Sequence, residues 1–116
     1  MTTKPASPHR FLALERALEL IALLRVPLAE IRTEDADLAR QIRRAANSIA
    51  LNLGEGERRR GKDRRHHYRI AAGSARETQV ALRVAVAWRE GDGGDCVAAI
   101  AKIDEVLAML WRITEG

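Results

Sequence analysis

The chain of 116 residues has a net charge of +4 and one cysteine, and it is 47% hydrophobic but only 3% aromatic. This length corresponds to one domain, the shortage of aromatic residues favours helices over a sheet, and a lone cysteine excludes an intrachain disulfide framework. No run reaches the ~18 apolar residues of a membrane span, and residues 1–10 lack the apolar core of a signal peptide, so we expect a soluble cytoplasmic protein.

Residues 1–7 are expected to form a flexible N-terminus, followed by a helix over about residues 8–31. Ser7 is a suitable cap, and Pro8 suits the first helical position, where its missing N–H costs nothing. Pro27 should kink this helix or break its last turn. The expected buried stripe consists of Phe11, Leu14, Leu18, Ile21 and Leu28.

Thr33 is the expected cap of a second helix, which ends near the segment 54–56. The expected stripe of this helix consists of Leu38, Ile42, Ala45, Ile49 and Leu53. A third helix begins after Gly61 and stops at the glycine-rich segment 91–94, which is typical of a turn. Its expected stripe consists of Ile70, Gly73, Ser74, Glu77, Ala81, Val84 and Trp88.

A fourth helix is expected from about Asp95 to the chain end. Its stripe consists of Cys96, Ile100, Ile103, Leu107 and Leu110. No strand-like alternation of convincing length occurs anywhere in the sequence. Four helices with short connections predict an all-α fold, an antiparallel up-down four-helix bundle, with residues 8–116 forming a single domain.

The first and last helices carry apolar residues on more than one face. The surplus residues are Leu20, Leu23, Leu24 and Ile31 in the first helix and Val97, Val106, Met109, Trp111 and Ile113 in the last. A helix of a four-helix monomer needs only one buried face. We therefore expect a homo-oligomer in which subunits bury the surplus, with a wider internal stripe as the alternative. Small residues such as Gly73, which costs about 1 kcal/mol in a helix interior, suggest close helix packing.

Charge is distributed unevenly along the chain. The segment Arg40–Arg69 contains ten arginines and lysines against three acidic residues, a charge of +7, which leaves −3 for the rest. This asymmetry suggests a phosphate-rich or acidic partner, although a solvated charged face is the simpler alternative. Arginine predominates over lysine, which suits forked, salt-sensitive contacts with phosphate oxygens. The expected nucleic-acid-binding residues are Arg40, Arg43, Arg44, Arg58, Arg59, Arg60, Lys62, Arg64, Arg65 and Arg69.

A nucleotide-binding loop is excluded, although Gly56, Gly61 and Lys62 match the spacing G-x-x-x-x-G-K. That motif needs Ser or Thr after the lysine, where Asp63 stands, and it must follow a strand rather than a helix. Its central positions here are also mostly arginine. The adjacent His66 and His67 point about 100° apart on a helix and cannot chelate one ion. We expect neither a metal nor a cofactor.

Five polar residues lie near the apolar stripes of the two middle helices: Ser48, Asn52 and Glu55 on one, Ser74 and Glu77 on the other. Burial could raise the pKa of a carboxyl in such a cluster and support catalysis. A hydrogen-bond network that sets the helix register is the favoured interpretation. No histidine or cysteine is placed to form a nucleophile pair, so no enzymatic activity is expected.

Two segments, LARQIRRAANSIALNLGEGERR (38–59) and YRIAAGSARETQ (68–79), carry a family resemblance. They resemble the four-helix-bundle proteins related to the 23S ribosomal RNA intervening-sequence proteins, and more distantly the accessory variability proteins of diversity-generating retroelements. The matching residues are Ile42–Ala45, Ser48, Ile49, Asn52, Glu55, Gly56, Arg69–Ala71, Gly73, Ser74 and Glu77. This chain departs from the family pattern at Ala50, often a proline, and in its unusually basic triplet Arg58–Arg60.

The resemblance implies a homopentameric ring of four-helix bundles without catalytic activity, in contact with structured RNA or DNA or with a nucleic-acid enzyme. The hypothesis from the sequence is therefore a non-enzymatic oligomer that binds nucleic acid through its arginine-rich corner. The alternative is a protein–protein scaffold whose basic corner pairs with acidic surfaces of a partner or of a neighbouring subunit.

Overall fold

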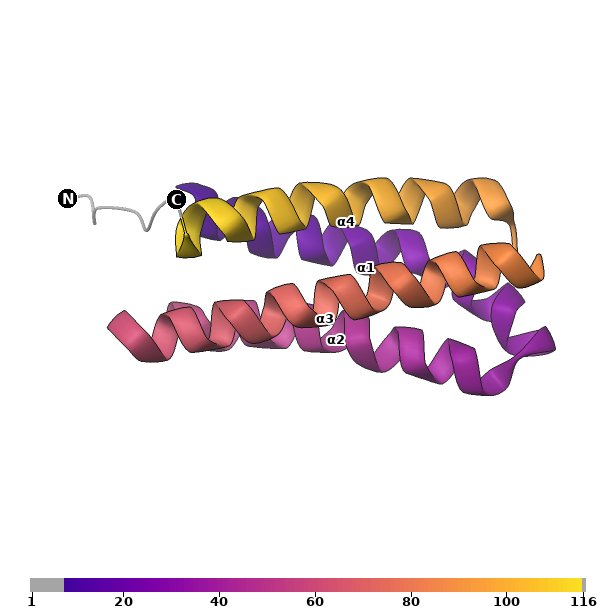
Figure 1. The fold of residues 1–116 in the computed structure, drawn as a ribbon, viewed down its shortest axis with the longest axis horizontal. Coiled ribbons are helices and arrows are strands. Elements are labelled where there is room, and N and C mark those ends of the chain that lie inside the picture. The colour runs from indigo at the N-terminus through magenta and orange to yellow at the C-terminus, as the bar shows by residue number, and fades with distance from the viewer. Residues whose placement is uncertain (1–7, 116) are drawn as a thin grey trace.

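The computed structural model describes residues 8–115, with side chains described from residue 12 onward. This part of the chain forms four α-helices and no strand: α1 spans Pro8–Glu34, α2 Ala36–Glu57, α3 Gly61–Trp88 and α4 Gly93–Thr114. The helices alternate in direction along an elongated molecule of 50 × 27 × 20 Å (Figure 1). The predicted all-α four-helix bundle is confirmed. The expectations for residues 1–7, for the Ser7 cap and for the Phe11 side chain lie outside the described part.

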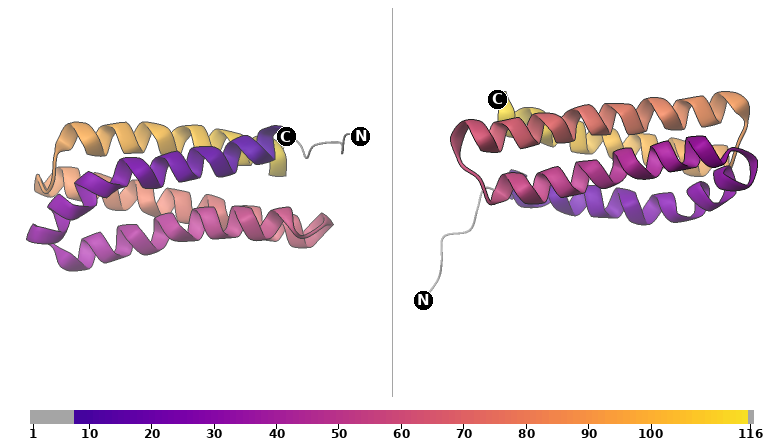
Figure 2. Two further views of the ribbon diagram at one scale, coloured as in Figure 1. Left: turned by 180° about the vertical axis from the view of Figure 1, so that it is seen from behind. Right: turned by 90° about the horizontal axis from the view of Figure 1, so that it is seen from below.

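Each helix packs against two neighbours: α1 and α3 both contact α2 and α4. The connections α1–α2 and α3–α4 lie together at one end of the bundle (Figure 2). The α2–α3 turn lies at the opposite end, together with the last turn of α4. None of the described helices combines the length and the apolar composition that crossing a membrane requires.

The connection between α1 and α2 is a single residue, Asp35. Its Oδ1 atom accepts a hydrogen bond from the backbone N–H of Leu38 at 3.0 Å, so Asp35 caps α2. The prediction that Thr33 caps this helix is wrong. Thr33 lies in the last turn of α1, where its hydroxyl donates to the carbonyl of Glu30 at 2.7 Å, a local bond that satisfies the side chain without ending the helix.

Pro27 does not break α1, which continues to Glu34. The turns after Pro27 bend toward α2 (Figure 2), as expected of a proline that removes one backbone hydrogen bond and crowds the preceding turn. The Pro27 ring itself is buried. The bend brings the end of α1 over the start of α2, where Asp35 alone joins them.

Residues 89–92 connect α3 to α4. Arg89 has a φ of 59°, and the N–H of Glu90 donates to the carbonyl of Ala85 at 2.9 Å, which closes α3. Asp92 then caps α4, because its Oδ1 atom accepts from the N–H of Asp95 at 2.9 Å. The fourth helix therefore begins at Gly93, two residues earlier than predicted. A capping carboxylate accommodates glycines in the first turn that would otherwise favour a loop.

The core confirms the predicted stripe of α2, since Leu38, Ile42, Ala45, Ile49 and Leu53 are all buried. In α4, three residues of the predicted stripe are buried, Cys96, Ile103 and Leu110, and the other two, Ile100 and Leu107, are half-buried against the core. Polar residues separate the apolar ones in α2, so its buried face is unambiguous.

The predicted stripes of α1 and α3 are wrong in part. The core face of α1 consists of Ala13, Ala17, Leu20, Leu24 and Ile31, whereas Leu18 is 47% exposed. The core face of α3 contains Tyr68, Ala71, Ala75, Thr78, Leu82 and Ala85, together with Ser74 and Ala81 of the predicted stripe. The rest of that stripe is exposed: Ile70, Gly73, Glu77, Val84 and Trp88. Apart from Tyr68 and Leu82, the residues that face inward on α3 are small and let it approach its neighbours closely, while isoleucine and valine face outward.

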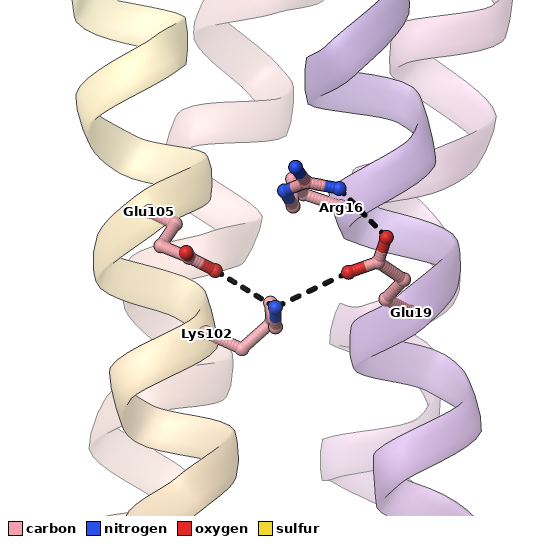
Figure 3. Close-up of polar contacts among 4 residues, drawn as sticks. All are labelled: Arg16, Glu19, Lys102 and Glu105. Carbon is pink, nitrogen blue, oxygen red and sulfur yellow. Dashed lines mark hydrogen bonds and ion pairs between the residues drawn. The ribbon is translucent and has the colours of Figure 1, made fainter.

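A cluster of four charged residues joins α1 to α4 (Figure 3). Lys102 Nζ lies 3.2 Å from Glu19 Oε1 and 2.9 Å from Glu105 Oε2, and Arg16 Nη1 lies 2.7 Å from the other oxygen of Glu19. Hydrogen bonding to Lys102 lowers the pKa of Glu19, with Arg16 contributing in the same direction, and the two carboxylates raise the pKa of Lys102. The cluster aligns two helices that are distant in sequence.

Candidate nucleic-acid interface

The α2–α3 corner is built on close contact between Gly56 and Tyr68. A Cβ atom on Gly56 would lie 2.8 Å from Cδ1 of the Tyr68 ring, so only glycine fits there beside the buried tyrosine. Gly61, with a φ of 55°, then starts α3 in a conformation that glycine adopts readily. This sharp return places the basic residues of two consecutive helices at one end of the bundle.

Arg64 stabilises the corner from within. Its Nε atom donates to the carbonyl of Gly56 at 3.1 Å, and its Nη2 atom donates to the carbonyl of Glu57 at 3.4 Å. These carbonyls belong to the last turn of α2, where the regular helical hydrogen bonds end, and the Gly56 carbonyl also accepts from the N–H of Arg59 at 3.1 Å. The guanidinium also opposes the partial negative charge at that helix end. Arg64 therefore holds the turn, and two of its nitrogen atoms donate within the chain.

Two further arginines of the corner have acidic partners. Arg59 Nε lies 2.9 Å from Glu55 Oε2, and hydrogen bonding to Arg59, with its positive charge, lowers the pKa of Glu55. Arg69 Nη2 lies 3.3 Å from Glu115 Oε2, which connects α3 to the residue after α4. Both pairs are solvent-exposed, so each contributes little to stability and leaves donors for a ligand.

Four basic side chains of the corner make no ion pair or hydrogen bond among the described residues: Arg58, Arg60, Lys62 and Arg65. All four are exposed. Two of them, Lys62 and Arg65, line a depression of about 420 Å³ together with Arg69 and Thr114. Lys62, Arg65 and Arg69 of α3 are spaced at i, i+3 and i+7, which places them on one face of the helix.

The structure divides the ten predicted residues into two sets. Arg40, Arg43 and Arg44 lie on α2 at least 14 residues before Arg58, about 20 Å along the helix axis. Arg40 forms an ion pair with Asp37, and Arg40 and Arg43 line a groove between α1 and α2. Arg44 is exposed elsewhere on α2. The sequence segment suggested one surface, but its members belong to the corner and to a separate flank.

A polar network crosses the α2–α3 interface. Ser74 Oγ donates to Ser48 Oγ at 2.7 Å, and Asn52 Nδ2 donates to the same Ser48 oxygen at 3.1 Å. Asn52 Oδ1 lies 3.0 Å from Nδ1 of His67, and because an amide oxygen only accepts, His67 donates. The chain of contacts fixes the register between the two helices near the corner.

Sequence analysis placed five residues in this network, and the structure brings three of them together: Ser48, Asn52 and Ser74. Glu55 instead pairs with Arg59, and Glu77 is exposed on α3. The sequence did not predict His67 as a member of this network. The available signal was that the short α2–α3 turn returns the start of α3 alongside Asn52. The arrangement contains no nucleophile beside a base.

Other chemistry has little support in the described part of the chain. Burial raises the pKa of the Cys96 thiol, with Asp92 adding to the effect, so the reactive thiolate is disfavoured. No group of three or more His, Cys, Asp or Glu side chains from residue 12 to 115 could hold a metal ion. The G-x-x-x-x-G-K segment spans the end of α2, a turn and the start of α3.

The fold and the site define an all-α bundle with a corner that carries an excess of basic side chains. Residues 13–112 match the family model of the 23S rRNA-intervening sequence protein. Because the match covers most of the chain, this protein belongs to that family.

A solved structure shares the fold. It is the crystal structure of a protein of unknown function from the S23 ribosomal protein family of Bacteroides thetaiotaomicron, 20% identical to this chain, with a TM-score of 0.73 over 93% of this chain and 99% of that one. The likeness extends over the whole bundle rather than one hairpin. No curated protein matches the chain.

Proposed function

We propose that this protein is a non-enzymatic, cytoplasmic oligomer that binds RNA or DNA through its α2–α3 corner, without a cofactor. The observation that carries the proposal is the group of four exposed cations without acidic partners, Arg58, Arg60, Lys62 and Arg65, beside Arg69. Lys62, Arg65 and Arg69 share one face of α3, and exposed cations in a row suit successive phosphates of a backbone. The family is described by its connection with 23S rRNA, which makes structured RNA the first ligand to test.

Base recognition is not part of the proposal. Residues 54–69 contain no Phe or Trp, and Tyr68 is buried against Gly56, so the α2–α3 turn itself offers a poor stacking surface. Binding should therefore depend on phosphate charge rather than on sequence. The resemblance to accessory variability proteins suggests a nucleic-acid enzyme as a partner. Such an enzyme would bind the same RNA or DNA as this protein.

The proposal is tested by fluorescence anisotropy with labelled RNA and DNA at two salt concentrations. The variant Lys62→Glu/Arg65→Glu removes two of the four unpaired cations and should weaken binding to both nucleic acids. The dependence of log K on log salt should become shallower by about two, since each lost phosphate contact removes about one. The matched control, Arg76→Glu/Arg83→Glu, reverses two exposed charges farther along α3 and should bind as the wild type does. Absence of binding at low salt would overturn the proposal.

We further propose that the oligomer forms through the outer face of α3. Val80 and Trp88 are 56% and 71% exposed, and Ile70, Val84 and Gly73 complete an apolar stripe along this helix. Nothing lies within 4 Å of a Cβ placed on Gly73, so packing within the chain does not require glycine there. A neighbouring subunit that approaches α3 closely would require it. The family resemblance implies a pentamer, and the mass of the oligomer in light scattering would give the number of subunits.

A scaffold function is the second candidate, and the opposite end of the bundle favours it. That end carries seven acidic residues: Glu30, Glu34, Asp35, Asp37, Glu90, Asp92 and Asp95. The basic corner of one subunit could pair with the acidic end of another. In that case Lys62→Glu/Arg65→Glu would reduce the mass of the oligomer in light scattering, and the loss of nucleic-acid binding would be secondary.

A further inference from the structure

A second depression lies between α1 and α2, away from the basic corner. It has a volume of about 440 Å³, which is within the range of ligand-binding pockets. Its floor is aliphatic, formed by Ile21, Leu24, Leu28, Ala39 and Ala46. From Ile21 to Arg32 the groove follows α1 for about 16 Å, or three helical turns.

Four arginines border this apolar floor: Arg25 and Arg32 on α1, and Arg40 and Arg43 on α2. Among the described residues only Arg40 has an acidic partner, Asp37. Arg25, Arg32 and Arg43 are exposed and make no ion pair or side-chain hydrogen bond within residues 12–115. The combination of an apolar floor and an unpaired cationic rim requires a ligand that is apolar on one side and acidic on its edges.

We propose that this groove docks an acidic amphipathic helix of a partner protein. A helix lying between α1 and α2 would place an aliphatic stripe on the floor, as in other helix-in-groove complexes. Arg25 and Arg32 are seven residues apart, which is two turns or about 10.5 Å. Carboxylates at positions i and i+7 of the ligand helix match this spacing, and Arg40 and Arg43 face the acidic residues of its other edge.

Other occupants fit less well. A nucleic acid would leave an aliphatic floor without any aromatic side chain for its bases. A second copy would need an exposed, acidic, apolar helix face, and the outer side of α1, with Leu12, Leu23 and Glu19, is one candidate. Its central carboxylate, Glu19, is however already held by Arg16 and Lys102 (Figure 3).

The probe for this proposal is a fluorescein-labelled synthetic helix of about four turns. It carries leucines at helical spacing with glutamates on both edges, and a matched peptide carries lysines in place of the glutamates. Anisotropy with the full-length protein should show saturable binding of the acidic peptide only. Arg25→Glu/Arg32→Glu should raise its Kd about tenfold, and Arg25→Gln/Arg32→Gln should raise it less. The matched control Arg76→Glu/Arg83→Glu should leave the Kd unchanged.

Four outcomes would overturn the proposal. The first two are that the acidic peptide does not bind saturably and that the lysine peptide binds equally well. The third is that the Kd is unchanged in Arg25→Glu/Arg32→Glu. The fourth is that peptide binding is lost only where circular dichroism shows unfolding. If this variant instead loses oligonucleotide binding, the groove belongs to the nucleic-acid surface. If it reduces the mass in light scattering, the groove holds a second copy. Either result rejects a partner helix without bearing on the corner residues.

Discussion

Gly56 and Tyr68 determine how closely α2 and α3 approach each other at the corner. The Tyr68 ring is buried against the glycine Cα, and Arg64 reaches the carbonyl of the same glycine at 3.1 Å. Gly56 therefore makes room for the Tyr68 ring, and its carbonyl accepts the hydrogen bond by which Arg64 caps the end of α2. The position of every cation on the first turns of α3 depends on this contact.

Gly56→Ala should destabilise the protein by about 1–3 kcal/mol, because a methyl group would overlap the tyrosine ring in a packed core. Gly54→Ala is the matched control two residues away, where nothing lies within 4 Å of the added Cβ. This change should stabilise the protein by about 0.5–1 kcal/mol through higher helix propensity. Urea denaturation followed by circular dichroism measures both. Equal effects of the two changes would show that the ring contact is unimportant.

At the scale of elements, the connection α3–α4 packs against the end of α1, where Gly91 lies beside Ile31 and the carbonyl of Pro27. Glu90 of this connection has one carboxylate oxygen shielded from solvent without a hydrogen-bond partner among the described residues. Its pKa is raised by loss of solvent and by the charges of Asp35 and Glu34. The charged form is therefore less favourable in the folded chain than in the unfolded one.

The sign of the pH dependence follows from this shift. A raised pKa in the folded state means that the folded chain retains the proton more strongly, so stability is lost as the pH rises through the pKa of folded Glu90. Glu90→Gln removes this loss and should stabilise the protein at neutral pH, with the difference disappearing below about pH 4. Glu77→Gln on the exposed face of α3 is the control. Thermal unfolding at several pH values tests the expectation, and a stabilisation that does not vary with pH would contradict it.

The elements differ in how far their sequence predicted them. In α2 arginine, glutamine and asparagine separate the apolar residues, so both its helical state and its buried face could be predicted. In α1 apolar residues occur on nearly every side, and nothing in the periodicity distinguishes Leu20 from Leu18. In α3 alanine faces the core and valine faces outward, which reverses the usual weighting by hydrophobicity. Only packing against the neighbouring helices determines such a face.

The site was predictable at the level of charge but not of geometry. The arginine-rich segment predicted a basic surface, and its corner is exposed as expected. The use of Arg64 as a helix cap depends on the angle between two helices, which a sequence pattern does not specify. The pairing of α1 with α2 brought Arg25 and Arg32 beside Arg40 and Arg43, and the first two lie outside the basic segment altogether.

At the scale of the whole molecule, the proposed oligomer depends on the outer face of α3. Val80→Glu/Val84→Glu places two charges in the apolar stripe and should reduce the mass measured by light scattering, while the helical content by circular dichroism stays the same. Charged groups are depleted from the centre of subunit interfaces because their desolvation is costly. Val97→Glu/Trp111→Glu on the exposed face of α4 is the control for loss of apolar surface elsewhere. An unchanged mass in the α3 variant would place the interface on another face.

The two ends of the elongated bundle also differ in charge, with the arginine-rich turn at one end and most of the acidic caps at the other. A rod of 50 Å with this separation possesses an electric dipole moment along its length. The field of a phosphate polymer therefore exerts a torque that turns the α2–α3 end forward before contact, out to about 10 Å at moderate salt. Under the proposed binding of nucleic acid, the bundle would approach its ligand in a preferred orientation, and the separation of charge would influence the rate of binding as well as its strength.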